Sequence, residues 1–424
     1  MYSLRYIFSL VVMTVATFFS YAQQVDTRVR IFDPVVKSLR IAPVNNPYLP
    51  AVYVLGSDEV LNVNFDVLLP EVQYLRYSVT HCDALWQPSQ LVENEYIDGF
   101  NSADIDDYAP SQATFVNYYN YNFLIPNDNL RITRSGNYLL TVYPQDDPER
   151  ILFQTRFYVS EHTVNVYAEA TTNTDVDYND AHQQINFEVQ ARPGLIADPY
   201  TELTAVVTQN SRSDNAAVVR RPLMVNGNSI VFEHNRELIF PAGNEYRRFE
   251  TVSVNYYNMR VSKVQYFQPF YHATVEIDQP RRYQQYLYDQ TQYGRFTIRN
   301  AEMDDNNTRS DYMFTHFTLD TGGERLTGGR LFIQGEMTDG LPLNDCLMKW
   351  DEQAQAYTAN LLLKQGHYNY QYLWVPDGTS VGQTQLIEGD KYQTINEYLI
   401  CLYHRPFGER YDRLIGHALI HSSN

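Results

Sequence analysis

The sequence predicts an all-β protein made of tandem antiparallel immunoglobulin-like β-sandwich domains. Apolar and polar residues alternate with the period of two that is typical of half-buried strands. The chain contains 36 Tyr and 21 Phe, and aromatic side chains fit the pleated surface of a sheet. No amphipathic pattern of helical period is sustained for about ten residues or more. Because parallel strands need long crossover connections that are usually helical, we expect antiparallel sheets.

Three segments show the strand pattern most clearly. In 185–190 the apolar residues alternate with Asn, Glu and Gln, so one face should be buried and the other wet. Segment 138–142 repeats this alternation after a Ser-Gly turn. Segment 368–374 places three Tyr and one Trp on one face, and a Pro-Asp-Gly turn follows it. No repeat of propeller-blade length is visible, which favours sandwiches.

The length of 424 residues is sufficient for two or three domains behind an export leader. One strand pattern ends near residue 160, and a polar break begins around Pro280. We therefore expect a leader at 1–22, a first sandwich at 23–160, a middle sandwich at 161–280 and a C-terminal immunoglobulin-like sandwich at 281–424.

Residues 1–22 have the pattern of a secretory signal peptide. Arg5 supplies the positive start, and 6–19 form an apolar stretch that is too short to span a bilayer. The small-x-small sequence at 20–22 is typical of a cleavage site. Gln23 follows it, whereas a lipid anchor would require Cys at this position. The sequence therefore predicts an exported protein that is not itself inserted in the membrane.

Charge and cysteine usage limit the possible partners. The net charge is −18, so the surface should repel nucleic acid and anionic lipid, and we expect no nucleic-acid partner. The three cysteines, Cys82, Cys346 and Cys401, are too few and too widely spaced for a disulfide framework. Cys346 and Cys401 could pair within the C-terminal domain, or each could be a buried free thiol.

Strings that resemble catalytic or metal motifs lack the context that their chemistry needs. The string 378–382 matches the GxSxG of serine hydrolases, but a turn precedes it and no helix can form after Ser380. Asp175, Asp177 and Asn179 have the first spacings of a calcium loop, which fails at its sixth and twelfth positions. His417 and His421 lack the Glu of a zinc helix. We assign no catalytic, cofactor-binding or metal-binding residue and expect no enzyme.

Five strings, in order along the chain, together resemble one protein family. They lie at 77–91, 135–142, 173–189, 240–250 and 392–417. They are similar to the plug proteins of the type IX secretion system of Bacteroidetes, and the similarity extends over nearly the whole exported chain. His81, Trp86 and Asn244, which lie within these strings, are interpreted as core or turn residues and not as contacts with a partner.

This resemblance implies a non-enzymatic periplasmic protein that is peripheral at the outer membrane and has no cofactor. Its implied partner is the large outer-membrane translocon barrel of the type IX secretion system. The implied role is to bind the periplasmic opening of this barrel and to close it when no substrate is passing. A wide barrel contains a water-filled channel that must be sealed when it is idle. Packed sheets suit such a role because they deform little.

A second resemblance supports an alternative function. Residues 329–340 and 361–378 are similar to immunoglobulin-like modules that accompany starch- and glycogen-active enzymes. The Trp that such modules often carry after the first strand is missing at 337–339. The alternative is therefore an exported glycan-binding protein that uses its C-terminal domain, with Trp350 and Trp374 as the side chains to test. A shared fold does not by itself imply a shared function.

Overall fold

The computed structural model describes residues 26–256 and 258–422. It is nearly all β, with 45% strand and 6% helix, and the prediction of an all-β sandwich protein is confirmed. The described helices have only three or four residues, because the strand-like alternation leaves no room for longer ones. They are α1 (Glu93–Tyr96), α2 (Pro199–Glu202), α3 (Asn306–Arg309), α4 (Leu343–Cys346), η1 (Arg236–Leu238) and η2 (Glu336–Thr338). The expected leader lies outside the described residues.

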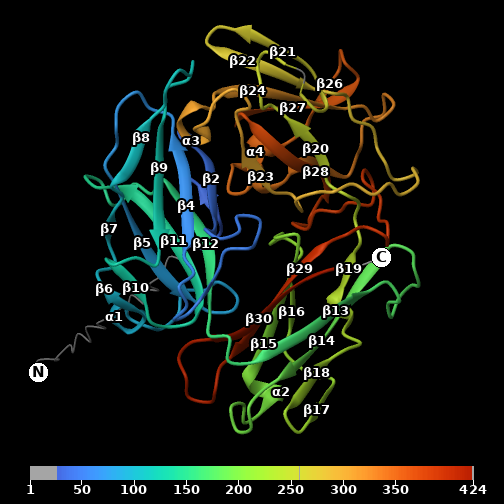
Figure 1. Cartoon of the computed structure of the whole chain (residues 1–424). Coiled ribbons are helices and arrows are strands. Elements are labelled where there is room, and N and C mark those ends of the chain that lie inside the picture. Colours follow the sequence, from blue (N-terminus) through green and yellow to red (C-terminus); the bar gives the residue numbers. More distant parts are fainter. Residues whose placement is uncertain (1–25, 257, 423–424) are drawn as a thin grey trace, which may run out of the picture.

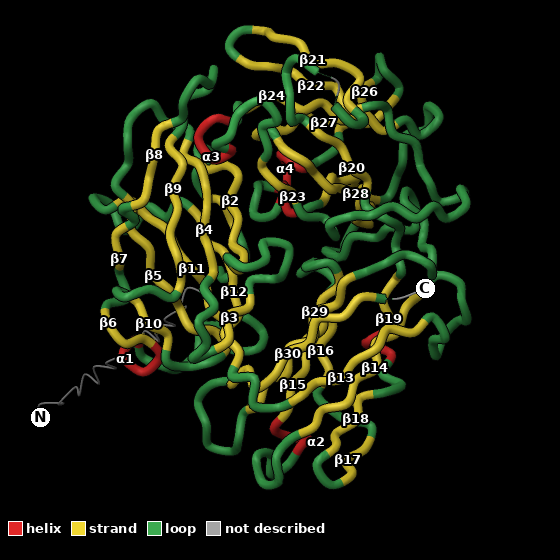
Figure 2. Tube along the Cα trace, viewed as in Figure 1, coloured by secondary structure: helices red, strands yellow, loops and turns green. Residues whose placement is uncertain are grey.

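Three large hydrophobic cores divide the described chain into three lobes. We call residues 26–160 the first lobe, 161–242 with 392–422 the second lobe, and 243–391 the third lobe. Figure 1 shows them as three bodies, with the first on the left, the third at the upper right and the second at the lower right. Figure 2 shows that each lobe consists of strands joined by loops, with only short helices. We propose that each lobe is one folding unit.

The first lobe packs two main sheets around a core that includes Phe65, Tyr77 and Phe153. One sheet has the order β1-β12-β11-β5-β7, and β3 adds to β12 as a parallel strand. The other has the order β2-β4-β9-β8, and β6 pairs with β10 in a small third sheet. The bounds are β1 (Arg30–Ile31), β2 (Val36–Pro43), β3 (Val52–Val54), β4 (Leu61–Val67), β5 (Leu75–Cys82), β6 (Ile97–Gly99), β7 (Ala103–Asp104), β8 (Asp107–Pro110), β9 (Tyr119–Ile125), β10 (Leu130–Ile132), β11 (Gly136–Pro144) and β12 (Phe153–Ser160).

The second lobe combines two distant parts of the chain. One sheet has the order β13-β14-β18-β17, with β19 also on β14, and the other has the order β16-β15-β29-β30. The bounds are β13 (Asn165–Thr171), β14 (His182–Gln190), β15 (Leu203–Gln209), β16 (Ala217–Val219), β17 (Met224–Asn226), β18 (Ser229–Phe232), β19 (Ile239–Pro241), β29 (Glu397–His404) and β30 (Arg413–His421).

The third lobe packs a sheet of order β20-β28-β23, with β25 also on β28, against a sheet of order β21-β22-β24-β27-β26. Tyr368, Tyr370, Tyr372 and Trp374 lie on one face of β28 and point into the core, as the sequence predicts. The bounds are β20 (Arg247–Glu250), β21 (Val261–Phe267), β22 (Phe270–Val275), β23 (Phe296–Ile298), β24 (Tyr312–Leu319), β25 (Gly329–Gln334), β26 (Lys349–Asp351), β27 (Ala356–Lys364) and β28 (Gly366–Pro376).

The strand pairing crosses the division that the sequence predicts near residue 280. β29 pairs with β15 through seven residues, although the predicted C-terminal domain 281–424 contains β29. At the other side, β20, β21 and β22 lie before residue 280 and belong to sheets of the third lobe. Every residue of β29 is buried, because one face packs in the second lobe and the other packs against the first. The lobes as defined here replace 161–280 and 281–424 in our proposal.

Candidate functional site: the joints between the lobes

A buried ion pair joins the first lobe to the third. The Nζ atom of Lys364 on β27 lies 2.6 Å from Oδ2 of Asp66 on β4, and their side chains are 1% and 0% exposed. The hydroxyl of Tyr312 on β24 donates to the same carboxylate oxygen at 2.6 Å. The amide of Asn120 donates to the other oxygen at 2.8 Å. The charge of Asp66 is thus balanced inside the protein and not by water.

Burial determines the acid–base behaviour of this joint. It lowers the pKa of Lys364, and the nearby Asp66 carboxylate opposes that shift. Burial also raises the pKa of Tyr312 far above its ordinary value, so this side chain remains a neutral donor. The ammonium group also lies 4.2 Å from the centre of the Tyr118 ring, which adds a cation–π contact. Together these contacts fix the relative position of β4 and β27.

A second joint connects the first lobe to the β29–β30 hairpin. The Tyr403 hydroxyl donates to Oδ1 of Asn137 at 2.6 Å, and the backbone N–H of Ala84 donates to Oδ2 of Asp412 at 2.8 Å. Within the second lobe, Arg413 forms a two-pronged pair with Glu161 at 3.0 and 2.6 Å, and the hydroxyl of Ser135 in the first lobe donates to the same Glu161 carboxylate at 2.8 Å. A small core of Val52, Ala84, Leu399, Cys401, Tyr403 and Leu414 lies between the two lobes.

A third joint connects the second and third lobes where the chain passes between them twice. Arg295 of the third lobe donates to both oxygens of Glu397 on β29, at 3.2 and 2.5 Å, and both side chains are nearly fully buried. The guanidinium of Arg212 donates to the carbonyl of Gly382 at 2.7 Å. The backbone N–H of Ile395 donates to Glu245 at 3.0 Å. Side chains therefore connect both crossing segments.

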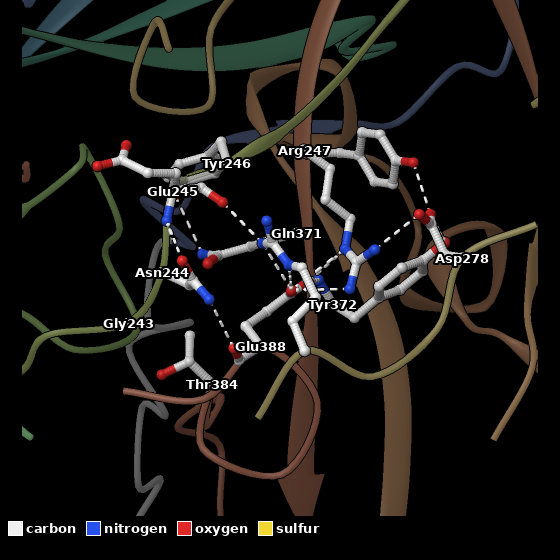
Figure 3. Close-up of polar contacts among 12 residues, drawn as sticks. Gly243, Asn244, Glu245, Tyr246, Arg247, Asp278, Gln371, Tyr372, Thr384 and Glu388 are labelled. Atoms are coloured by element: carbon white, nitrogen blue, oxygen red, sulfur yellow. Dashed lines mark hydrogen bonds and ion pairs between the residues drawn. The ribbon is translucent and has the colours of Figure 1, made fainter. Parts of the chain in front are cut away.

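A buried charge network adjoins this third joint, and Figure 3 shows its central residues. Arg247 on β20 lies 2.6 Å from Asp278 and 3.0 Å from Glu388, with 3% of its side chain exposed. The hydroxyls of Tyr370 and Tyr372 donate to Asp278 at 2.6 and 2.8 Å. Each charge in this core therefore has an opposite charge or a hydrogen-bond donor at contact distance.

The network keeps Glu388 charged although it is completely buried. Burial by itself raises the pKa of this carboxyl, but Arg247 and Arg281 outweigh burial and lower the pKa to about 2. The backbone carbonyl oxygen of Glu388 accepts a hydrogen bond from the side-chain amide of Asn244 at 2.9 Å. This bond holds the start of the third lobe against its end. The network therefore fastens the two ends of the third lobe to each other.

The structure places the catalytic and metal-like strings apart from these joints. Ser380 lies in an exposed loop after β28, and the described chain contains no helix after it. Asp175 accepts hydrogen bonds from His234 and Gln184, and Asp177 accepts from His182. Among the described residues, His, Cys, Asp and Glu form no cluster of three or more that is arranged to hold a metal ion.

The histidines, cysteines and tryptophans named above lie in strands, turns or cores. His417 and His421 lie on β30, and His421 is at its end. All three cysteines are free and buried, so the open question about Cys346 and Cys401 is answered in favour of free thiols. His81 and Asn244 are buried, and Trp86 lies in the turn after β5. Trp374 lies in the core of the third lobe, and Trp350 packs partly buried against Tyr357.

The comparisons with known proteins identify the family. Residues 36–161 match the family described as the type 9 secretion system plug protein 1st domain. The chain belongs to the type IX secretion system plug protein family. A crystal structure of a hypothetical protein from Parabacteroides merdae has 40% sequence identity and a TM-score of 0.92, covering 94% of this chain and 100% of that one.

A second solved structure has no significant similarity in fold. A Pseudomonas fluorescens alkylpurine DNA glycosylase bound to DNA matches 31% of this chain and 30% of its own, with 10% identity and a TM-score of only 0.17. The search of curated proteins gives no match.

Within the described residues, no helix has the length and apolar character needed to cross a membrane.

The strings that resemble the plug family meet at the joints. Parts of 77–91, 135–142 and 392–417 meet where the first lobe packs on the second, through Ala84, Asn137 and Tyr403. Parts of 173–189, 240–250 and 392–417 meet where the chain passes to the third lobe. The strings are interpreted from the sequence as structural, but nothing in the sequence predicts that they meet. Polar residues within their strand patterns, such as Asn137, are the one feature of the sequence that could indicate such a contact between lobes.

Proposed function

We propose that this plug-family protein is a non-enzymatic periplasmic plug that binds the periplasmic opening of the type IX translocon barrel and closes it when no substrate is passing. The observation that carries the proposal is that every lobe is joined to both others by buried polar contacts. Separating the partners of such a contact costs free energy, because a buried charge would then lack its partner. A body joined in this way resists bending, as a stopper must.

The exposed surface also suits a protein that binds and releases. The net charge of −18 favours solubility and disfavours unspecific binding to anionic lipid. Exposed aromatic side chains, such as Phe267 and Tyr266, offer the kind of anchor that dominates many protein interfaces. The peripheral location at the outer membrane is part of this proposal.

The test is a pull-down of the tagged protein from detergent-solubilised outer membranes. We expect a very large barrel protein to co-purify with it. A strain without the plug should also become permeable to large dyes and antibiotics that intact outer membranes exclude. Recovery of soluble periplasmic proteins alone, together with unchanged permeability, would refute the proposed function.

The glycan-binding alternative has less support. Aromatic side chains that stack on sugars must be exposed, but Trp374 is only 7% exposed and contributes to the core of the third lobe. A glycan array tests this alternative directly. Binding that is lost in a Trp350→Ala variant, while the circular dichroism spectrum is retained, would favour it over the plug role.

A further inference from the structure

The β21–β22 hairpin presents an open sheet edge at the end of the third lobe that is farthest from the second. β21 is the terminal strand of its sheet, and among the described strands only β22 pairs with it. Figure 2 shows the hairpin projecting at the top of the molecule. Five of the seven residues of β21 are exposed, and the other two are Val261 and Val264. An exposed edge strand has free backbone N–H and C=O groups and is a template for a further strand.

Aromatic rings cover both faces of this hairpin. Phe267 is 58% exposed and lies 5.3 Å from the ring of His272, which stacks on Phe314. On the opposite face Tyr266, which is 43% exposed, contacts Tyr271 and Phe115. The side chains of a strand added beside β21 would therefore contact aromatic rings on both faces of the extended sheet. This arrangement offers more apolar contact than the backbone alone.

The hairpin carries little charge and no carboxylate. The chain has 50 acidic residues, yet 261–275 contains none and has Lys263 as its charged residue. Three other edge strands carry acidic side chains, Glu169 on β13, Asp107 on β8 and Asp351 on β26, which would repel an acidic partner segment. β21 carries Lys263 and no carboxylate, so its charge complements an apolar segment with an acidic side chain opposite Lys263.

We propose that β21 is the docking edge for the translocon partner, which adds an extended segment of its own as a further strand. The segment has apolar side chains that cover Tyr266 and Phe267 and a carboxylate that pairs with Lys263. This inference rests on the proposed plug function, because it names the surface through which that function acts. Main-chain hydrogen bonds provide the affinity, and the aromatic rings provide the specificity.

Site-directed crosslinking tests the edge. The three native cysteines are buried, so a cysteine introduced as Gln265→Cys can be labelled selectively with benzophenone maleimide. Illumination of solubilised outer membranes should crosslink this variant to the barrel partner. Glu169→Cys on the exposed edge strand β13 is the matched control and should give no barrel adduct. A barrel adduct from Glu169→Cys alone, or an adduct of Gln265→Cys with a second copy of this chain, would overturn the proposal.

A substitution pair tests the aromatic contact. Phe267→Ser should lower the recovery of the barrel in the pull-down by about tenfold, the scale of a central interface residue. Phe407→Ser, the same change at a fully exposed Phe on the β29–β30 loop, should leave recovery unchanged. If the wild type recovers the barrel and Phe267→Ser recovers it equally, the docking edge is wrong but the plug function stands. If the wild type recovers no barrel, both proposals fail.

Discussion

At the scale of single residues, the molecule keeps charges inside its joints and balances each with a close partner. Asp66 accepts hydrogen bonds from Lys364, Tyr312 and Asn120. Burying two charges costs several kcal/mol, so a buried ion pair need not stabilise the fold more than apolar residues do. What it does provide is geometry, because the lobes fit only when donor and acceptor meet. We therefore interpret the pair as a device that fixes position.

Removing one partner of this pair should be costly. Lys364→Ala leaves Asp66 buried without its cation, and we expect the free energy of unfolding to fall by about 3–5 kcal/mol. Arg76→Ala is the control, because its pair with Asp104 lies at the surface, with side chains that are 37% and 46% exposed, and its loss should change the free energy of unfolding far less. Urea unfolding of both variants provides the measurement. Equal losses in the two variants would contradict a joint that depends on Lys364.

His417 should make stability depend on pH. Burial is the main cause that lowers its pKa to about 4, and the neighbouring His162 lowers it further. The unfolded chain, with an ordinary His pKa of about 6.5, therefore binds the proton first as the pH falls. Stability is full above that value and should decrease by about 1–2 kcal/mol between about pH 7 and pH 5.

The measurement for His417 is the urea midpoint at several pH values in wild type and in His417→Gln. Gln is neutral throughout, so the variant should lose that part of the pH dependence. The difference between the two proteins isolates His417 from the other histidines. Parallel pH profiles would show that His417 does not contribute the expected proton uptake.

At the scale of elements, close backbone approach lets the β29–β30 hairpin rest on the first lobe. Gly136 begins β11 with φ of +138°, a region that favours glycine. A Cβ atom there would lie 2.5 Å from Nε2 of His81 and 3.2 Å from the carbonyl oxygen of Asp412. The glycine thus belongs to the joint as much as to its own strand.

Gly136→Ala should therefore open the joint between the first and second lobes. We expect a loss of about 3 kcal/mol from overpacking and backbone strain, together with faster proteolysis of the loop 405–412. Gly227→Ala is the matched control, because Gly227 also has positive φ but a Cβ would meet nothing within 4 Å, so about 1 kcal/mol is expected. Urea midpoints and timed digestion measure both effects. A milder effect for Gly136→Ala than for Gly227→Ala would contradict this account.

At the scale of the whole molecule, local pattern predicts the strands but not which strands share a sheet. The alternation in 185–190 and the aromatic face of 368–374 correspond to β14 and β28. Both could be predicted because alternation is a pattern among residues that are close together in the sequence. The pairing of β29 with β15 brings together residues almost two hundred positions apart, and no periodicity reports such a distance. The same holds for Asp66 and Lys364, which appear unrelated in the sequence.

The proposed lobes make a prediction that separates them from the sequence-based division. A chain that ends at Lys391 lacks β29 and β30, which provide half of one sheet of the second lobe and part of its core. We expect amide hydrogen exchange to become fast throughout β13 to β19, since that core loses Tyr398, Ile400 and Leu402. The third-lobe strands β24 and β27 should remain protected, because their partners are intact. If protection were instead lost in β24 and β27 and kept in β14 and β15, then 161–280 and 281–424 would be the folding units after all.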